Sequence, residues 1–221
     1  MTDILKQIDL YWQKLLKLQF LASENISHKP TKGQLRENFI KQAVKEQYCN
    51  ATIESGILAD NGWQSTQADF LWLVQNARHG GMDVYNLADC KLFMEIKSCA
   101  VHHELVALNK IAEELHQRSA QINNDRRMLV GMFCYSTKAS DTTILSKLGF
   151  SYDKELQGYL PYDENKDLLR NIDFLCSLNI HYTESIEEET AYMVIRDRYG
   201  SCTLQKDNPV IPYFLRLFGA D

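Results

Sequence analysis

Apolar residues at helical spacing mark the beginning of the chain. Between residues 4 and 21 they form one wide stripe, which predicts an amphipathic helix. The stripe consists of Ile4, Leu5, Ile8, Tyr11, Trp12, Leu15, Leu16 and Leu18. After a polar connection, Thr31 and Gln34 have the spacing of a capping box, so we expect a second helix from Thr31 to near Tyr48.

Three runs that are typical of strands follow this second helix. We expect strands over Thr52–Leu58, Gln67–Val74 and Lys91–Ser98, and the first is closed by the turn sequence Asp60-Asn61-Gly62. The second run reads QADFLWLV and has the nearly continuous apolar character of a buried strand.

A long amphipathic segment, His102–Arg118, predicts the next helix, and the apolar run Met128–Tyr135 predicts a strand after it. That strand can join the others only through a crossover. The order helix, three strands, helix, strand therefore predicts an α/β fold with a mixed sheet and helices packed on it. Beyond it, Asp141 can cap a short helix that ends at Gly149.

The last part of the chain is harder to assign from its pattern. The polar stretch Tyr152–Glu189 stays unassigned, whereas Tyr192–Arg198 predicts a strand and Pro209–Phe218 a short closing helix. Without an internal repeat or a low-complexity linker, we expect one domain over residues 1–221. Its parts are an N-terminal helix (1–30), a core (31–136) and a C-terminal decoration (137–221).

Composition and charge narrow the possible functions. The net charge is −5, which excludes a generally basic nucleic-acid coat. The charge is uneven, because residues 91–150 carry a net +2 and residues 151–221 a net −6. A polyanion would therefore bind the middle of the chain, where we assign Lys110, Arg126 and Arg127 as DNA contacts.

No targeting or membrane signal is visible in the sequence. Met1–Lys6 lack a basic region followed by an apolar run, and no apolar stretch approaches the roughly 20 residues of a membrane helix. None of the six cysteines forms a C-x-x-C pair. We expect a cytoplasmic protein with reduced, buried thiols and no membrane partner.

Several catalytic motifs are absent, among them the phosphate-binding glycine loops and the G-x-S-x-G nucleophile elbow. His103-Glu104 begins like a zincin motif, but Ala107 stands where the second histidine belongs. We interpret His102 and His103 as a surface pair. Cysteine–histidine catalysis stays open, although no local pattern supports it.

Charged residues in two apolar strands carry the candidate chemistry. Asp69 lies inside the second strand, and Glu95 and Lys97 lie inside the third. Because strand side chains alternate, Glu95 and Lys97 share a face, and Ile96 points to the other. A buried carboxylate is costly unless it is paired or binds a metal, so we expect the two acids to converge beside Lys97. Glu37, on the preceding helix, could add a third acid.

Such a group of residues has the properties that metal-dependent phosphodiester hydrolysis requires. Carboxylates bind Mg²⁺ (or Mn²⁺), which polarises the phosphate and makes a bound water easier to deprotonate. A lysine beside them can orient that water or neutralise charge in the transition state. The alternative interpretation is a Glu–Lys surface pair next to an unrelated aspartate.

The D…E-x-K pattern and the order of elements resemble the PD-(D/E)xK nuclease superfamily and its restriction-endonuclease-like fold. Within it, the chain resembles the NucC-like effector nucleases of bacterial anti-phage defence. The similarity covers residues 32 to about 118, with a weaker echo in Pro209–Phe218. The matching motifs are Lys32-Gly33 with Glu37, Ser65-Thr66-Gln67-Ala68-Asp69, and Glu95-Ile96-Lys97.

This resemblance implies roles for the matching residues. Asp69, Glu95 and Lys97 would be catalytic with Glu37 as an accessory; the metal would be bound at Asp69, Glu95 and Ile96, and Gln67 would contact DNA. It also implies a Mg²⁺-dependent endonuclease acting on double-stranded DNA. The family's homo-oligomers imply a trimer or a pair of trimers, with a cyclic oligonucleotide as a possible activator.

The chain departs from the family's pattern at the activator pocket, and its charge keeps an alternative function open. The chain offers no match to the family's nucleotide-pocket arginine and tyrosine near Gln47–Tyr48 and Asn76–His79. Its acidity also favours a catalytically silent module that binds a nucleotide or a protein on the same fold. Independently, the wide apolar stripe of the first helix predicts self-association.

Overall fold

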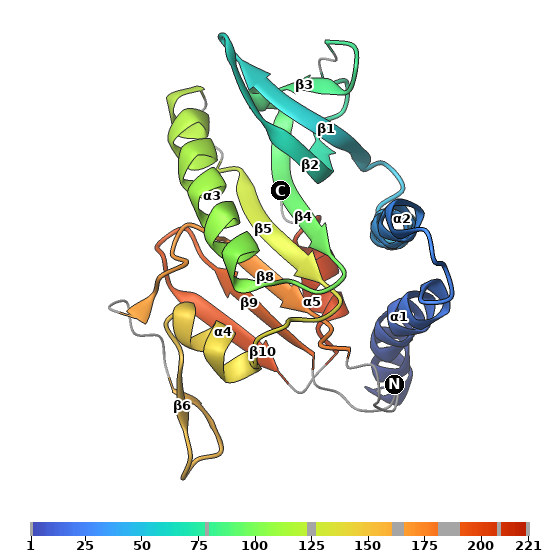
Figure 1. Cartoon of the computed structure of the whole chain (residues 1–221), viewed down its shortest axis with the longest axis vertical. Coiled ribbons are helices and arrows are strands. Elements are labelled where there is room, and N and C mark those ends of the chain that lie inside the picture. Colours follow the sequence, from blue (N-terminus) through green and yellow to red (C-terminus); the bar gives the residue numbers. More distant parts are fainter. Residues whose placement is uncertain are drawn as a thin grey trace.

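The computed structural model describes residues 2–77, 80–122, 127–160, 166–180, 191–206 and 209–219. An eight-stranded mixed sheet forms its centre, in the order β10-β9-β8-β5-β4-β2-β1-β3 (Figure 1). The strands are β1 (Thr52–Asp60), β2 (Trp63–Leu73), β3 (Val84–Asn86), β4 (Cys90–Lys97), β5 (Leu129–Cys134), β8 (Phe174–Ser177), β9 (Tyr192–Arg196) and β10 (Cys202–Lys206). A separate hairpin consists of β6 (Ser151–Asp153) and β7 (Gly158–Leu160).

Helices cover both faces of this sheet (Figure 1). They are α1 (Thr2–Ser23), α2 (Lys29–Gln47), α3 (His102–Ile122), α4 (Asp141–Lys147) and α5 (Ile211–Arg216), with a 3-10 turn, η1 (Leu87–Asp89), before β4. β1, β2 and β4 pair antiparallel, whereas β4–β5 and β5–β8 are parallel, with α3 as the crossover between β4 and β5. The predicted mixed α/β sheet flanked by helices is therefore confirmed.

Two apolar cores lie on the two faces of the sheet. α3 and α4 close one core with Leu105, Leu108 and Ile144. α1, α2 and α5 close the other, which includes Phe20 and Phe214. Because most central strands carry apolar side chains on both faces, they read as continuous apolar runs in the sequence.

A buried arginine fixes α2 against α1 and the sheet. The Arg36 guanidinium forms an ion pair with Glu24, donates a hydrogen bond of 2.8 Å from Nε to Ser23 Oγ, and stacks 3.9 Å above the Phe20 ring. The Tyr135 hydroxyl donates a 2.9 Å hydrogen bond to the Arg36 carbonyl oxygen. The position of α2 is therefore held by polar and aromatic contacts as well as by its apolar face.

Two predicted helix caps are wrong. α2 begins at Lys29 rather than Thr31, because the His28 ring nitrogen accepts the hydrogen bond from Thr31 N. Pro30 fits inside the first turn, where the helix needs no donor. α4 is capped by the side chain of Ser140 rather than Asp141.

The stretch that the pattern left unassigned contains β6, β7 and β8, and we did not predict β3 or β10. These strands have three to five residues each, too few for a periodic signal. Two of the six thiols, Cys49 and Cys99, are exposed, contrary to the expectation of buried thiols. In the part of the chain that the structure describes, no helix is long and apolar enough to cross a membrane.

The first helix packs largely on its own chain. Leu16 and Phe20 are buried in the second core, whereas Tyr11 is 56% and Leu18 49% exposed. The predicted stripe residues Ile4, Leu5 and Ile8 have side chains outside the described part. Among the described positions, Tyr11 and Leu18 leave a small apolar surface for self-association.

Two glycines test the packing of the fold. A Cβ at Gly131 would lie 2.5 Å from the ring and the carbonyl oxygen of Phe174, whereas a Cβ at Gly33 would meet nothing within 4 Å. We expect Gly131→Ala to lower the free energy of unfolding by about 1–3 kcal/mol or more, because the packed sheet cannot yield. We expect Gly33→Ala to raise it by about 0.5–1 kcal/mol, because alanine favours a helix. Urea denaturation of both variants measures this, and equal effects would contradict it.

Candidate active site

The sheet brings the two predicted carboxylates together. β2 and β4 are antiparallel neighbours with Phe70 opposite Met94, so Asp69 and Glu95 lie next to this pair. α2 packs against both strands. β3 intervenes in sequence between β2 and β4 but lies at the far edge of the sheet.

A β-bulge sets the position of Asp69. On β1, Gly56 pairs with Ala68 and Glu54 pairs with Leu71, so two residues of β2 lie opposite Ser55 alone. The bulge explains why Ala68 and Phe70, two residues apart, enter opposite cores. Ser55 Oγ donates a 2.9 Å hydrogen bond to the Asp69 carbonyl oxygen across the bulge. Bulges of this kind re-aim a side chain beside a functional site.

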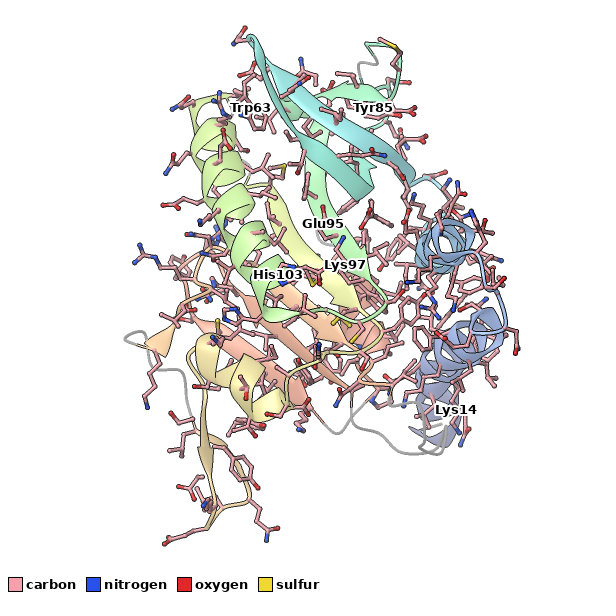
Figure 2. All side chains as sticks on the ribbon, in the orientation of Figure 1. Lys14, Trp63, Tyr85, Glu95, Lys97 and His103 are labelled. Carbon is pink, nitrogen blue, oxygen red and sulfur yellow. The ribbon has the colours of Figure 1, made fainter. Side chains whose placement is uncertain are left out.

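Lys97 lies between the two carboxylates. Its Nζ is 2.6 Å from Glu95 Oε2 and 3.3 Å from Asp69 Oδ2, and Figure 2 shows Glu95 and Lys97 next to one another. Asp69 Oδ2 also accepts a 2.9 Å hydrogen bond from Ile96 N. The Ile96 side chain belongs to the opposite core, as strand alternation predicted, so Ile96 acts on the site through its main chain.

Burial and like charge shape the electrostatics of this group. Burial raises the pKa of Glu95, and repulsion by Asp69 raises it further against the attraction of Lys97. Burial lowers the pKa of Lys97, but the Glu95 and Asp69 carboxylates outweigh it and raise that pKa to about 12. Lys97 therefore keeps its proton at neutral pH.

Glu37 faces the same group from α2. Burial raises its pKa, and the nearby Asp69 carboxylate raises it further, with Lys41 and Lys97 opposing. The structure therefore brings together all four predicted catalytic residues, Asp69, Glu95, Lys97 and Glu37.

Lys41 and Ser55 were missed in the sequence. Lys41 lies one turn after Glu37, and its Nζ donates a hydrogen bond to Ser55 Oγ. The spacing of Glu37 and Lys41 places both on one side of α2, and this spacing is the sequence signal that could have identified Lys41 as a site residue. The sequence alone does not tell whether that side meets solvent or the sheet.

The carboxylates fit a hydrated Mg²⁺ better than a dedicated metal cage. Among the described residues, no group of three or more histidine, cysteine, aspartate or glutamate side chains has metal-site geometry. Mg²⁺ usually takes one or two carboxylates and keeps several waters. Burial and the neighbouring Asp69 charge raise the pKa of Glu95 and Glu37, and a divalent cation would relieve the repulsion between these carboxylates. The donor set is therefore compatible with the metal.

The predicted DNA contacts are dispersed. Gln67 is exposed on β2, two residues before Asp69, and Lys110 is exposed on α3. Arg126 lies outside the described residues. Arg127 forms an ion pair with the buried Asp173 and precedes β5, whereas Lys97 pairs with the last residue of β5. Arg127 therefore lies near the opposite end of that strand.

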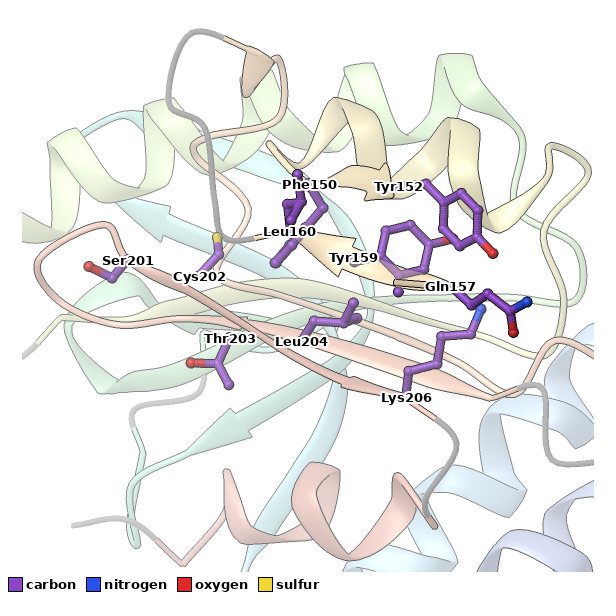
Figure 3. A pocket seen from close by; sticks show the side chains of 11 residues that line it. Phe150, Tyr152, Gln157, Tyr159, Leu160, Ser201, Cys202, Thr203, Leu204 and Lys206 are labelled. Atoms are coloured by element: carbon purple, nitrogen blue, oxygen red, sulfur yellow. The ribbon is translucent and has the colours of Figure 1, made fainter. Parts of the chain in front are cut away.

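The described part of the chain contains a smaller and a larger cavity. One of about 390 Å³ lies where the end of α2 meets β2 and β4, and Lys91 Nζ lies 4.5 Å above the Trp72 ring there. It is lined by Gln47, Tyr48, Cys49, Asn50, Ala51, Trp72, Leu73, Gln75, Lys91 and Phe218. The other, of about 880 Å³, lies between the β6–β7 hairpin and β10 (Figure 3), and no predicted site residue lines it.

The raised pKa of Glu95 predicts a stability effect. An acid whose folded pKa lies above its ordinary value of 4.5 destabilises the fold at neutral pH, and that penalty vanishes below pH 4.5. We therefore expect Glu95→Gln, in EDTA, to raise the free energy of unfolding at pH 7, with the gain fading as the pH falls toward 4. Urea denaturation at several pH values measures it, with the exposed Glu113→Gln as control. A Glu95→Gln variant less stable than wild type at pH 7 would contradict it.

Comparison with known proteins places the fold. No protein-family model and no curated protein sequence matches the chain. Among solved structures, NucC from P. aeruginosa ATCC27853 in its cAAA-bound form superposes with a TM-score of 0.66 at 13% identity, over 97% of this chain and 91% of that one.

NucC from E. coli MS115-1 gives a TM-score of 0.65 in its cAAA-bound form, at 13% identity over 97% of this chain and 88% of that one. Its apo form gives 0.58, at 12% identity over 96% and 89%. The chain thus has a NucC-like fold, as its motifs and the order of its elements predicted.

Proposed function

We propose that this chain is a metal-dependent endonuclease that hydrolyses phosphodiester bonds in double-stranded DNA as an anti-phage effector. The observation that carries the proposal is one lysine ammonium bonded to two partly buried carboxylates on neighbouring strands, Asp69 and Glu95. The NucC-like fold supports the proposal. In the sequence, the motifs that resemble those of that family include these residues.

The residues have separable tasks in this proposal. Asp69 and Glu95 would hold Mg²⁺ or Mn²⁺, which when bound polarises the phosphate and lowers the pKa of a coordinated water. Lys97, whose pKa is raised to about 12, keeps its proton at Nζ. It therefore serves as a cation that orients the water or stabilises charge building on the phosphate, rather than as a base. Glu37 adds a third carboxylate at the edge of the site.

The acidity of the chain supports a homo-oligomer, a trimer or a pair of trimers. A single copy with net charge −5 attracts DNA poorly, whereas an assembly multiplies its few basic surfaces. Cutting both strands also requires two active sites. Closed symmetric assembly is the usual way to supply them, and the exposed Tyr11 and Leu18 of α1 offer apolar surface for it.

The smaller cavity supports a second function, binding of a cyclic oligonucleotide. Two of the similar NucC structures are cAAA-bound. In this chain, the cavity combines an aromatic ring, Trp72, with the ammonium of Lys91, a pairing that suits a base beside a phosphate. The ligand would activate the nuclease. In the alternative form of the proposal, binding of the ligand would be the whole function of a catalytically silent module.

Removing the central ammonium tests the nuclease. We expect Lys97→Met to lower the cleavage rate of supercoiled plasmid by roughly 10²–10³-fold with Mg²⁺ or Mn²⁺, because a charge-stabilising group is lost. Assays with and without cAAA and other cyclic oligonucleotides cover activation, and Lys154→Met, exposed in the turn of the β6–β7 hairpin, is the matched control. Cleavage by Lys97→Met at the wild-type rate would refute the assignment. Intact plasmid under every condition with wild-type protein would favour the silent module.

Binding of cAAA tests the cavity. We expect the ligand to change the fluorescence of Trp72, and Lys91→Ala to weaken binding about tenfold, because a cation next to the ring and phosphate is removed. Lys14→Ala, at an exposed position of α1, is the control. The fluorescence change should vanish in Trp72→Phe. Undiminished binding by Lys91→Ala would contradict the cavity assignment.

A further inference from the structure

A second lysine is built into the site. Lys41 lies on α2, one turn after Glu37, and is half-buried, although lysine side chains are rarely buried without a partner. Burial lowers its pKa, while Glu37, Asp69 and Glu54 act in the opposite direction. An ammonium held in this way faces the carboxylates of the site.

Lys41 is also tied to the main chain at Asp69. Its Nζ donates a hydrogen bond to Ser55 Oγ, and Ser55 Oγ donates its own proton to the Asp69 carbonyl oxygen at 2.9 Å. Ser55 is the single β1 residue opposite the bulge. The hydroxyl uses its donor and one acceptor in this chain of contacts, so Lys41 and Ser55 together fix the bulge that aims Asp69.

The charges point to a second effect. Glu37, Asp69 and Glu95 are three carboxylates, and Lys97 and Lys41 are two ammonium groups among them. Each ammonium repels a divalent cation and attracts a phosphate. A site with both lysines therefore binds metal weakly by itself and more tightly when a phosphate adds negative charge.

We infer that Lys41 is a positioning residue with two separable actions: through Ser55 it holds the Asp69 bulge, and through its charge it makes metal binding depend on the phosphate substrate. This inference rests on the proposed function. It differs from an ordinary structural ion pair, whose removal would leave metal affinity unchanged or lower.

Three variants separate the two actions. Lys41→Met removes the charge and the hydrogen bond, Lys41→Arg keeps the charge, and Ser55→Ala keeps the charge but removes the link to Asp69. Circular dichroism first confirms that each variant is folded. Mn²⁺ binding without DNA is then measured by calorimetry, and plasmid cleavage is measured separately.

We expect Lys41→Met to bind Mn²⁺ roughly tenfold more tightly than wild type, because one nearby positive charge is gone. Lys41→Arg should bind Mn²⁺ with the wild-type affinity, and Ser55→Ala should bind it no more tightly than wild type, because it keeps the charge but releases the Asp69 ligand. Lys41→Met and Ser55→Ala should both cut DNA at least tenfold more slowly, because Asp69 is no longer fixed.

Unchanged or weaker Mn²⁺ binding by Lys41→Met would overturn the electrostatic action, and wild-type cleavage by Ser55→Ala would overturn the positioning action. Should Lys41→Met be unfolded, Lys41→Gln supplies the same comparison. If the wild-type protein binds Mn²⁺ but cuts no DNA, the proposed nuclease function fails, while tighter Mn²⁺ binding by the variant still supports the charge effect.

Discussion

Repulsion between two carboxylates on neighbouring strands is the constraint on which this site depends. Asp69 and Glu95 are partly withdrawn from water, where like charges interact strongly and an unpaired anion is costly. The Lys97 ammonium compensates both, and the Ile96 N–H group supports one of them. The fold thus holds an arrangement that it does not favour by itself, as sites that await a cation or a substrate commonly do.

The surrounding structure supplies the stability that this arrangement lacks. Two cores cover the faces of the sheet, and the Arg36 contacts with Ser23, Glu24 and Phe20 fix α2 where it meets β2 and β4. Because Glu37 lies next to Arg36 on that helix, the contacts that stabilise the helix pair also set how one carboxylate approaches the site. Packing and chemistry are coupled here through one short segment of backbone.

Residue periodicity predicts the face of a strand on which each side chain lies. It placed Glu95 and Lys97 on one face of β4 and Ile96 on the other, and the order of elements gave the mixed sheet. The direction of the Asp69 side chain could not be predicted in this way, because it is set by a bulge that no residue pattern indicates. Lys41 was not identified as a site residue, because the sequence pattern of the polar side of a helix is the same whether that side contacts water or carboxylates. The four-residue β8 is too short for any period to register.

α2 has a consequence of its own, because its middle carries Glu37 and Lys41 while its last residue, Gln47, lines the cavity beside Trp72 and Lys91. A helix of 19 residues moves as a nearly rigid rod, so a displacement of one part is transmitted along the helix. Thermodynamic linkage makes this relation reciprocal: by whatever factor an occupant of the cavity changes metal affinity, the metal changes the affinity of that occupant by the same factor. The middle of the helix and its C-terminal end would then be coupled without any contact between their ligands.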